Sequence, residues 1–324
     1  LFTHTLSKLG IEIRYADPKD PKNFERAVDD KTRAFYGETL PNPYLRVFPI
    51  KEVSDIGRKY NIPLIMDNTA APVICNPIEH GAAVVIHSLT KYIGGHGTAV
   101  AGSIVDSGNF DWTADPKRQP LFNEPDASYK GAVWGKVVPE LTGANIPFAV
   151  RARVCLLRDL GSACSPDNAF AIIQGIETVP LRMKQHCENA QKVVDYLKKH
   201  KEITRVIYST EHDKPLADRA KKYLKGGNGP MVGIELKGGF EAGKRFIESL
   251  KMFYHVANIG DARSLAIHPA STTHSQLNDE ELAASGVTQN YVRLCIGLEH
   301  IDDIIEDLDQ ALNKSSKGTL KAVS

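Results

Sequence analysis

The stretch that decides the fold is PLIMDNTAAPVICNPIEHGAAVVIHSLTKYIGGHG, residues 63–97. It contains two apolar runs, residues 63–66 and 82–86, and polar residues follow each run, Asp67 after the first and His87 and Ser88 after the second. Runs that are apolar throughout, instead of at every second residue, are typical of strands that are covered on both faces. The stretch therefore predicts neighbouring strands of a mainly parallel sheet that helices cover.

Helical and strand patterns alternate before this stretch as well. We expect helices at residues 1–9, 23–28, 50–59 and 77–80, and strands at residues 11–15 and 32–38. Regularity then fades at residues 108–145, which carry Pro, Gly and aromatic residues. A long irregular stretch inside a compact domain is usually functional, so we expect a loop on the substrate side or at an interface.

The second half of the chain predicts a smaller α/β unit. Ser165 and Pro166 indicate a helix start, and a long amphipathic segment follows at residues 168–199. We then expect strands at residues 205–208, 231–235, 264–268 and 291–296, and helices at residues 241–252, 280–284 and 301–312. The expected domains are a large one at residues 1–160 and a smaller C-terminal one at residues 161–324.

Composition narrows the function to small-molecule chemistry. The 324 residues include 40 Lys and Arg against 39 Asp and Glu, without a long run of either sign, so the charge pattern of a nucleic-acid-binding protein is missing. Five cysteines without a CxxC spacing favour neither a disulfide framework nor a zinc finger, and a reducing, cytoplasmic setting fits them. No apolar run approaches the roughly 18 residues that span a membrane.

Lys91 lies just beyond the second apolar run, between hydroxyl side chains and a glycine-rich turn. Ligands of open α/β sheets collect at the carboxyl ends of the strands, so Asp67 and Lys91 should share one rim. A lysine and an acid are the pair that pyridoxal phosphate needs, because the lysine holds the aldehyde as a Schiff base and the carboxylate keeps the pyridine nitrogen protonated. Ser88 and Thr90 supply hydroxyl groups that suit a phosphate.

Each of these residues also has an ordinary structural interpretation. A single lysine is usually solvated, and Asp67 could cap a turn. Ser88 and Thr90 could hydrogen-bond to their own loop backbone. The residues alone leave a cofactor site and an ordinary loop about equally favoured. They favour no metal site, because the histidines of this region lack ligand spacing.

Longer motifs carry a resemblance to a known family. DNTAAPVICNPIEHGA (67–82) and HSLTKYIGGHG (87–97) resemble the signature of the pyridoxal-phosphate enzymes of cysteine and methionine metabolism. The similarity continues through residues 38–43, 156–190, 258–277 and 292–308. It implies a large domain of the PLP-dependent fold type I, which is aminotransferase-like, followed by a smaller C-terminal α/β domain. Within the group, the sequence is most similar to the sulfhydrylases that act on O-acetylhomoserine.

The resemblance implies pyridoxal 5'-phosphate as cofactor and assigns residues to it. Lys91 would be the Schiff-base lysine and would move protons between the α and γ positions of the substrate. Asp67 would be the partner of the pyridine nitrogen, Ser88 and Thr90 would bind the phosphate, and Asn42 would lie near the ring oxygen.

Two further residues are implied for the substrate. Arg293 corresponds to the arginine that binds the α-carboxylate, which a guanidinium reads in a bidentate manner. The alternative for Arg293 is a surface charge at a strand end. Asn258 would lie near the same carboxylate.

The implied reaction is a γ-replacement in methionine biosynthesis, in which O-acetyl-L-homoserine and sulfide or a thiol give homocysteine or methionine and acetate. Three alternatives stay open: a methionine γ-lyase, an O-succinylhomoserine sulfhydrylase or cystathionine γ-synthase, and a catalytically impaired chain. The last arises because the family has a preceding segment, with an aromatic residue over the cofactor and a glycine-rich phosphate turn, that we expect to be absent here. The resemblance also implies a homotetramer built from two dimers.

Overall fold

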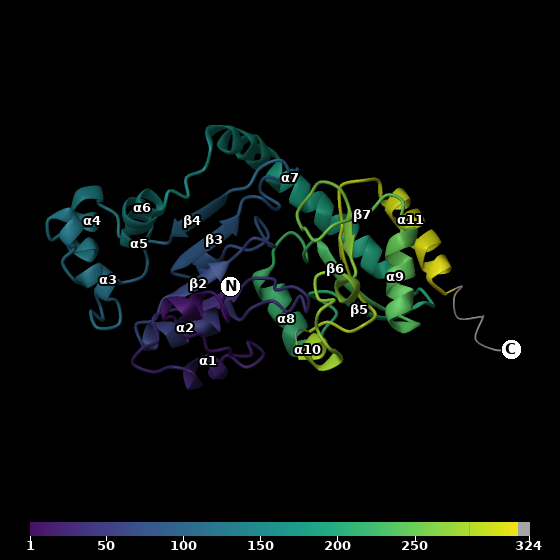
Figure 1. Cartoon of the computed structure of the whole chain (residues 1–324), viewed down its shortest axis with the longest axis horizontal. Helices are drawn as coiled ribbons and strands as arrows, with labels where there is room; N and C mark the ends of the chain where they lie inside the picture. The colour runs from purple at the N-terminus through teal and green to yellow at the C-terminus, as the bar shows by residue number, and fades with distance from the viewer. Residues whose placement is uncertain (285, 317–324) are drawn as a thin grey trace.

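The computed structural model describes residues 1–284 and 286–316. It contains a four-stranded sheet with strand order β1-β2-β3-β4 and a five-stranded sheet with strand order β5-β6-β9-β8-β7. The long helix α7 (Pro166–Leu197) runs from one half of the molecule to the other (Figure 1). Within the described ranges, no helix combines the length and the apolar character that are needed to cross a membrane.

The first sheet carries the residues of the predicted site at one edge. Its strands are β1 (Phe35–Glu38), β2 (Leu64–Asp67), β3 (Val84–Ser88) and β4 (Gly102–Asp106). The first three strands are parallel, which confirms the predicted mainly parallel sheet, and β4 is antiparallel to β3. Strand β4 was not predicted; it carries glycine and serine at its start, and both Ile104 and Val105, which point to opposite faces of the sheet, are exposed.

The beginning of the chain is less regular than expected. The described helices are η1 (Leu6–Leu9), α1 (Lys22–Arg26), α2 (Ile50–Lys59) and η2 (Pro77–His80). The strand predicted at residues 11–15 is wrong, because this segment pairs with no other strand of the described chain. Ile11 and Tyr15, which give the apolar alternation, are exposed to solvent, and Arg14 forms ion pairs with Glu12 and Asp29 instead.

The prediction of a single loop at residues 108–145 is wrong. It holds α3 (Pro120–Asn123), η3 (Ala127–Tyr129) and α4 (Trp134–Thr142), and α5 (Pro147–Arg151), η4 (Ala152–Leu157) and α6 (Arg158–Leu160) follow it. These short helices pack around a buried aromatic cluster in which the rings of Trp112 and Phe148 stack at 5.2 Å. A proline inside α4, Pro139, hid this helix from the pattern, whereas tertiary packing stabilises it.

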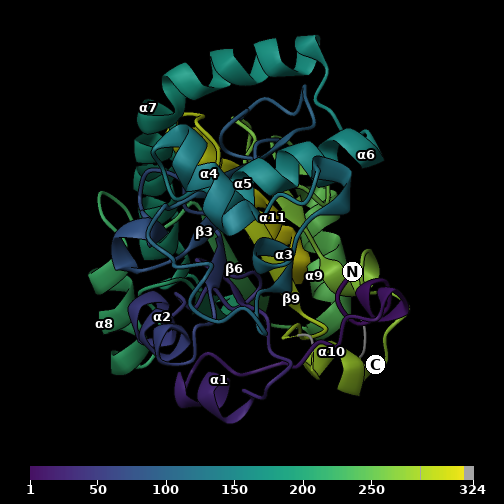
Figure 2. The same cartoon turned by 90° about the vertical axis from the view of Figure 1, so that its left-hand side faces the viewer.

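Helix α7 begins where the sequence predicted. The Ser165 hydroxyl accepts a hydrogen bond from the backbone N–H of Asn168 (3.2 Å), and Pro166 occupies the first turn. Figure 2 shows this helix passing along one side of the molecule. Its buried residues contribute to both main cores, since Val179 and Met183 belong to the first and Val193 and Val194 to the second.

The second sheet is mostly antiparallel, and helices cover one side of it. Its strands are β5 (Ile203–Ile207), β6 (Met231–Leu236), β7 (Tyr254–His255), β8 (Leu265–Ile267) and β9 (Tyr291–Cys295). The helices are α8 (Lys214–Tyr223), α9 (Gly239–Ser249), η5 (Pro269–Ser271), α10 (Asp279–Ala284) and α11 (Ile301–Ser315). Helix α8, strand β7 and the short helix η5 were missed, and the other elements agree with the prediction apart from their ends.

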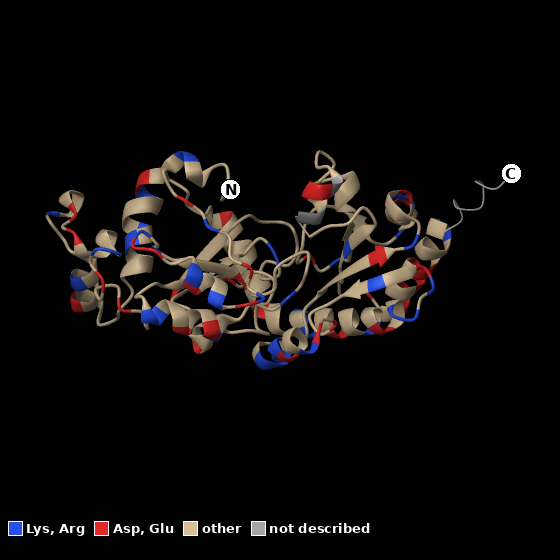
Figure 3. Ribbon diagram, turned by 90° about the horizontal axis from the view of Figure 1, so that it is seen from below, with Lys and Arg blue, Asp and Glu red and all other residues tan. Residues whose placement is uncertain are grey.

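The two halves share the first core, which joins Leu45 and Met66 to Met231 and Cys295. Polar contacts reinforce the junction, because the Tyr223 hydroxyl on α8 donates to Glu52 on α2 (2.5 Å). Positively and negatively charged residues alternate along the ribbon in both halves (Figure 3). The domain boundary near residue 160 stays a prediction, and residues 285 and 317–324 of the second domain lie outside the described residues.

Candidate active site

Lys91 lies in a tight turn directly after β3. Its backbone N–H donates to the Ser88 carbonyl (3.2 Å), and its own carbonyl accepts from the Gly95 N–H (2.7 Å). Gly260 packs against this turn with a φ of +79°, and a Cβ added to it would lie 2.7 Å from the Lys91 carbonyl carbon. Only glycine therefore fits behind the lysine, since it combines a positive φ with the absence of a side chain.

The side chain of Lys91 contacts Asn258, one of the two residues predicted for the substrate, and Asn258 in turn contacts the other, Arg293. Its Nζ donates a short hydrogen bond to the side-chain oxygen of Asn258. The backbone carbonyl of Asn258 accepts a hydrogen bond from Arg293 Nη2 (2.8 Å). The structure thus brings together Lys91, Asn258 and Arg293, although they are far apart in the sequence.

The surroundings of Lys91 lower the pKa of its side-chain ammonium group. Partial burial and the positive charge of Arg293 lower the pKa of the Lys91 ammonium. A lysine with a lowered pKa can act as a nucleophile and as a base nearer to neutral pH than a solvated lysine.

Arg293 lies in the middle of β9 and is half-buried. Its Nε is buried and has no hydrogen-bond partner among the described residues. A buried donor without a partner is costly, so a ligand that accepts from it is favoured. The alternative of a surface charge at a strand end does not describe this position.

Asp67 ends β2 at the same rim of the first sheet. Its Oδ1 accepts from the backbone N–H of Thr69 (2.8 Å), and the hydroxyl of Tyr36 lies 3.4 Å from its Oδ2. The next strand places Glu38 directly opposite Asp67 in the parallel register. Burial and the Asp67 carboxylate raise the pKa of Tyr36, so this phenol stays protonated and donates to Asp67.

Thr69 connects the Asp67 turn to the loop that carries Lys91. Its hydroxyl oxygen accepts from the backbone N–H of Ser88 (2.7 Å), and its own N–H bonds to Asp67. The sequence analysis missed Thr69, Tyr36 and Gly260. Thr69 belongs to the quoted DNT motif, which was the signal that could have identified it.

The other residues predicted to bind the cofactor, Thr90, Ser88 and Asn42, show no side-chain contact in the described part of the chain that indicates this role. The hydroxyl of Thr90 donates to the Ala101 carbonyl (3.3 Å) and accepts from the Ala101 N–H (3.1 Å). This agrees with the alternative interpretation, in which the hydroxyl hydrogen-bonds to the backbone of its own loop. Ser88 ends β3 on the rim. Asn42 is exposed after β1, and within the described residues no hydrogen bond joins its side chain to Lys91 or Asp67. The phosphate and ring-oxygen roles of these three residues stay predictions.

The described residues contain no group of three or more His, Cys, Asp and Glu that could hold a metal ion. His87, between Asp67 and the Lys91 turn in this part of the sheet, is largely buried, and this burial lowers its pKa. It therefore remains neutral near physiological pH.

A family model for Cys/Met metabolism PLP-dependent enzymes matches residues 1–313. The chain belongs to this family. It is 50% identical to an O-acetyl-L-homoserine sulfhydrylase of Leptospira meyeri over 96% of its length and 71% of that protein. It is 41% identical to a homocysteine synthase of Schizosaccharomyces pombe, over 96% of the chain and 72% of the relative.

A solved structure supports the same assignment. It comes from Campylobacter jejuni, is described as a candidate O-acetylhomoserine (thiol)-lyase, and holds an N'-pyridoxyl-lysine 5'-monophosphate. The two structures superpose with a TM-score of 0.88 at 38% identity, over 96% of this chain and 73% of the other. The predicted fold type I architecture is confirmed.

The protein is thus a PLP-dependent enzyme, and the cofactor prediction is confirmed. The residues of this site fit this group. A half-buried lysine with a lowered pKa and a carboxylate at the ends of adjacent strands are the two groups that pyridoxal phosphate requires. The buried, unpartnered Nε of Arg293 adds a donor for the carboxylate of an amino-acid substrate.

Proposed function

We propose that this protein converts O-acetyl-L-homoserine and sulfide to homocysteine and acetate. The observation that carries the proposal is the series of contacts from Lys91 through Asn258 to Arg293. These contacts place a basic amine near a guanidinium group that can bind a carboxylate. The relatives named above, sulfhydrylases and a homocysteine synthase, support this choice of substrate.

Arg293 binds the α-carboxylate of the substrate in this proposal. Its planar guanidinium can make two parallel hydrogen bonds, which fix the orientation of the amino acid as well as its position. The existing bond from Nη2 to Asn258 holds the guanidinium in place, and the free Nε faces no competing partner in the described structure.

Lys91 moves the protons. Its Nζ accepts a proton from Cα of the substrate and returns protons to the substrate's carbon atoms as acetate leaves Cγ and sulfide takes its place. Bound pyridoxal phosphate supplies the electron sink that makes the Cα proton acidic. Asp67 contributes by holding a proton on the pyridine nitrogen, and the Tyr36 hydroxyl and the Thr69 N–H orient its carboxylate.

Asn258 positions Lys91 and does not itself exchange protons. Its amide oxygen accepts from Nζ, so it holds the amine on the Arg293 side of the rim. Because the same residue bonds to Arg293 through its backbone, the lysine and the carboxylate-binding group keep a fixed relation.

The proposal is tested by a side-by-side assay of O-acetylhomoserine, O-succinylhomoserine, cystathionine and methionine with the cofactor-loaded protein. Homocysteine should form faster from O-acetylhomoserine and sulfide than any product from the others. Dominant release of a thiol and 2-oxobutyrate from methionine would replace the proposal with a γ-lyase. Faster use of O-succinylhomoserine would move it to the succinyl-dependent enzymes.

Replacing Asp67 by asparagine should slow turnover and leave the cofactor bound. Asparagine keeps the shape of the side chain but cannot hold a proton on the pyridine nitrogen. We therefore expect a loss of transition-state stabilisation of about 1.5–3 kcal/mol, typical of a hydrogen bond to a charged group. Steady-state kcat/KM measures the loss of turnover, and the cofactor absorbance measures whether the cofactor stays bound. The matched control is Glu38→Gln, the neighbouring carboxylate, and an equal loss in both variants would contradict a specific role for Asp67.

The pH dependence of Lys91 provides a separate check. Because burial and Arg293 lower its pKa, the amine should lose its proton below the ordinary lysine value of about 10.4. Reductive methylation of the cofactor-free protein followed by an NMR titration measures this midpoint. Replacing Arg293 by glutamine removes the repelling charge and should move the midpoint upward, whereas an unchanged midpoint would show that the two groups do not interact.

We also infer a homotetramer and a cytoplasmic location. The first half of α7 exposes several large apolar side chains, which supports a subunit interface over this face: Phe170, Ile173, Ile176 and Leu181. Light scattering tests the assembly, and a stable, active monomer would exclude it. The absence of nucleic-acid and membrane partners stays a prediction.

A further inference from the structure

Arg182 is a buried arginine of α7, and its side chain is 6% exposed. Burial lowers the pKa of its guanidinium group. Its hydrogen-bond partners in the described part of the chain are one hydroxyl and three backbone carbonyls, and no carboxylate there forms an ion pair with it. A buried charge is costly unless hydrogen bonds compensate it, so these contacts hold the guanidinium in one place.

Two of the carbonyls belong to the turn that carries Lys91. Arg182 Nη1 donates to the Tyr92 carbonyl (2.6 Å), and Nη2 donates to the Ile93 carbonyl (2.9 Å). These two residues directly follow Lys91 in the chain. The planar guanidinium therefore binds two successive peptide groups beside the lysine, which its fork of donors suits.

The remaining donors of Arg182 bind to its own helix. Nη2 also donates to the Gly175 carbonyl (2.7 Å), and Nε donates to the Thr178 hydroxyl (3.0 Å). The spacings from Gly175 to Thr178 and from Thr178 to Arg182 place the three residues on one face of α7. The guanidinium thus joins this face of the helix to the Lys91 turn.

The backbones of α7 and of the turn also approach each other closely. A Cβ added to Gly175 would lie 2.7 Å from the Ile93 carbonyl oxygen, so a larger residue would push the turn away from the helix. The buried ring of Tyr92 packs edge-on against His186 of α7, with the ring centroids 5.5 Å apart. The turn after Lys91 therefore rests on α7 through its backbone and through a side chain.

We propose that Arg182 is a positioning residue for Lys91. It holds the turn against α7, so that Lys91 Nζ stays beside Asn258 and at a fixed place relative to Arg293. The inference rests on the proposed role of Lys91 in the reaction. A lysine in place of Arg182 would keep the positive charge but would lack the planar fork that binds both carbonyls.

Steady-state kinetics of Arg182→Lys and Arg182→Gln test the proposal. We expect kcat for O-acetylhomoserine to fall about 10- to 100-fold, the effect of a displacement of a reacting group by about 1 Å. KM should change little, because Arg293 still binds the α-carboxylate. The fall in kcat without a rise in KM distinguishes a displaced Lys91 from a general loss of the site.

The pKa of Lys91 provides a readout that does not depend on turnover. It is measured by NMR titration of the reductively methylated, cofactor-free protein, in which the Lys91 resonance is the one that Lys91→Ala lacks. Partial burial and the charge of Arg293 lower this pKa in the parent protein. Release of the turn by Arg182→Gln should reduce both effects, so the midpoint should move upward.

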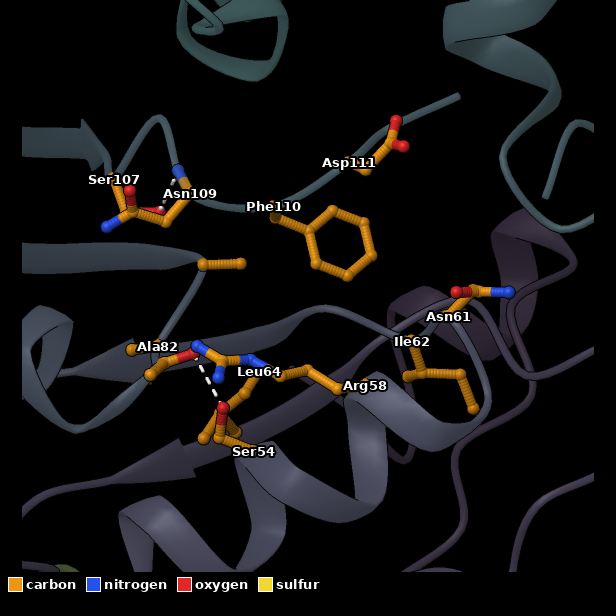
Figure 4. A pocket seen from close by; sticks show the side chains of 12 residues that line it. Ser54, Arg58, Asn61, Ile62, Leu64, Ala82, Ser107, Asn109, Phe110 and Asp111 are labelled. Atoms are coloured by element: carbon orange, nitrogen blue, oxygen red, sulfur yellow. Dashed lines mark hydrogen bonds between the residues drawn. The ribbon is translucent and has the colours of Figure 1, made fainter. Parts of the chain in front are cut away.

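Two control variants each remove an arginine that lies away from Lys91. Arg118 is also buried, and its Nη1 donates to the backbone carbonyls of Asp29 (2.9 Å) and Thr32 (2.6 Å). Arg58 lines a pocket at the start of β2, beside Ser54 (Figure 4). Arg118→Gln and Arg58→Gln should keep the parent kcat and the parent midpoint of Lys91.

Circular dichroism establishes that the variants are folded, and Arg182→Lys supplies both measurements if Arg182→Gln does not fold. The proposal is overturned if the Arg182 variants keep the parent kcat or the parent midpoint of Lys91. It is also overturned if Arg118→Gln lowers kcat as much as they do. Failure of the proposed role of Lys91 is detected separately, because Lys91→Ala would then keep the attached cofactor.

Discussion

Replacing Lys91 by alanine is expected to abolish turnover and the covalent attachment of the cofactor while the fold is retained. The change removes the amine that joins the cofactor's aldehyde and also the group that moves protons. Loss of general acid–base catalysis alone typically costs about 10²- to 10⁴-fold, and the loss of the covalent anchor adds to it. Turnover of O-acetylhomoserine and mass spectrometry after borohydride reduction measure the two losses.

The control for Lys91→Ala is Lys201→Ala, an exposed lysine after α7. It should keep both the activity and the borohydride-fixed cofactor. Circular dichroism should be the same for both variants, because within residues 1–284 and 286–316 the Lys91 side chain hydrogen-bonds only to Asn258 and belongs to no core cluster. A cofactor still fixed to Lys91→Ala protein by borohydride would place the Schiff-base lysine elsewhere.

Replacing Arg293 by alanine is expected to lower kcat/KM for O-acetylhomoserine. The expected loss of transition-state stabilisation is about 2–5 kcal/mol, the cost of removing one partner of a hydrogen-bonded charge pair. The variant should still bind the cofactor, since Lys91 and Asp67 remain. Steady-state kinetics measure the first effect and borohydride reduction the second.

Arg293→Lys distinguishes charge from geometry. Lysine restores the positive charge but not the two parallel hydrogen bonds, so it should recover only part of the lost activity. An unchanged kcat/KM in Arg293→Ala would show that another group binds the carboxylate. Loss of the cofactor together with activity would instead point to a structural role of the bond between Arg293 and the Asn258 carbonyl.

The sequence predicted the rim of the first sheet well because the relevant signals are local. A continuous apolar run that ends at Asp67, and another that ends before Lys91, require only neighbouring residues to be recognised. The same holds for α7, whose start depends on Ser165 and Pro166. The family motifs added Arg293 and Asn258, which no local pattern could have connected to Lys91.

The failures have tertiary causes. Residues 11–15 alternate like a strand, but no strand among the described residues lies beside them to accept their hydrogen bonds. Helix α4 contains a proline and is stabilised by the aromatic cluster around Trp112, which lies distant in sequence. Gly260 and Tyr36 became visible only when the fold brought them against Lys91 and Asp67.

The first core, in which Met66 of one sheet packs in the same cluster as Met231 and Cys295 of the other, has a thermodynamic consequence. Neither sheet can lose its packing without exposing apolar surface of the other, so we expect the unfolding of the two halves to be coupled. The position of Arg293 relative to Lys91 then depends on the packing of both halves. A destabilising substitution in either half weakens the alignment of both groups alike.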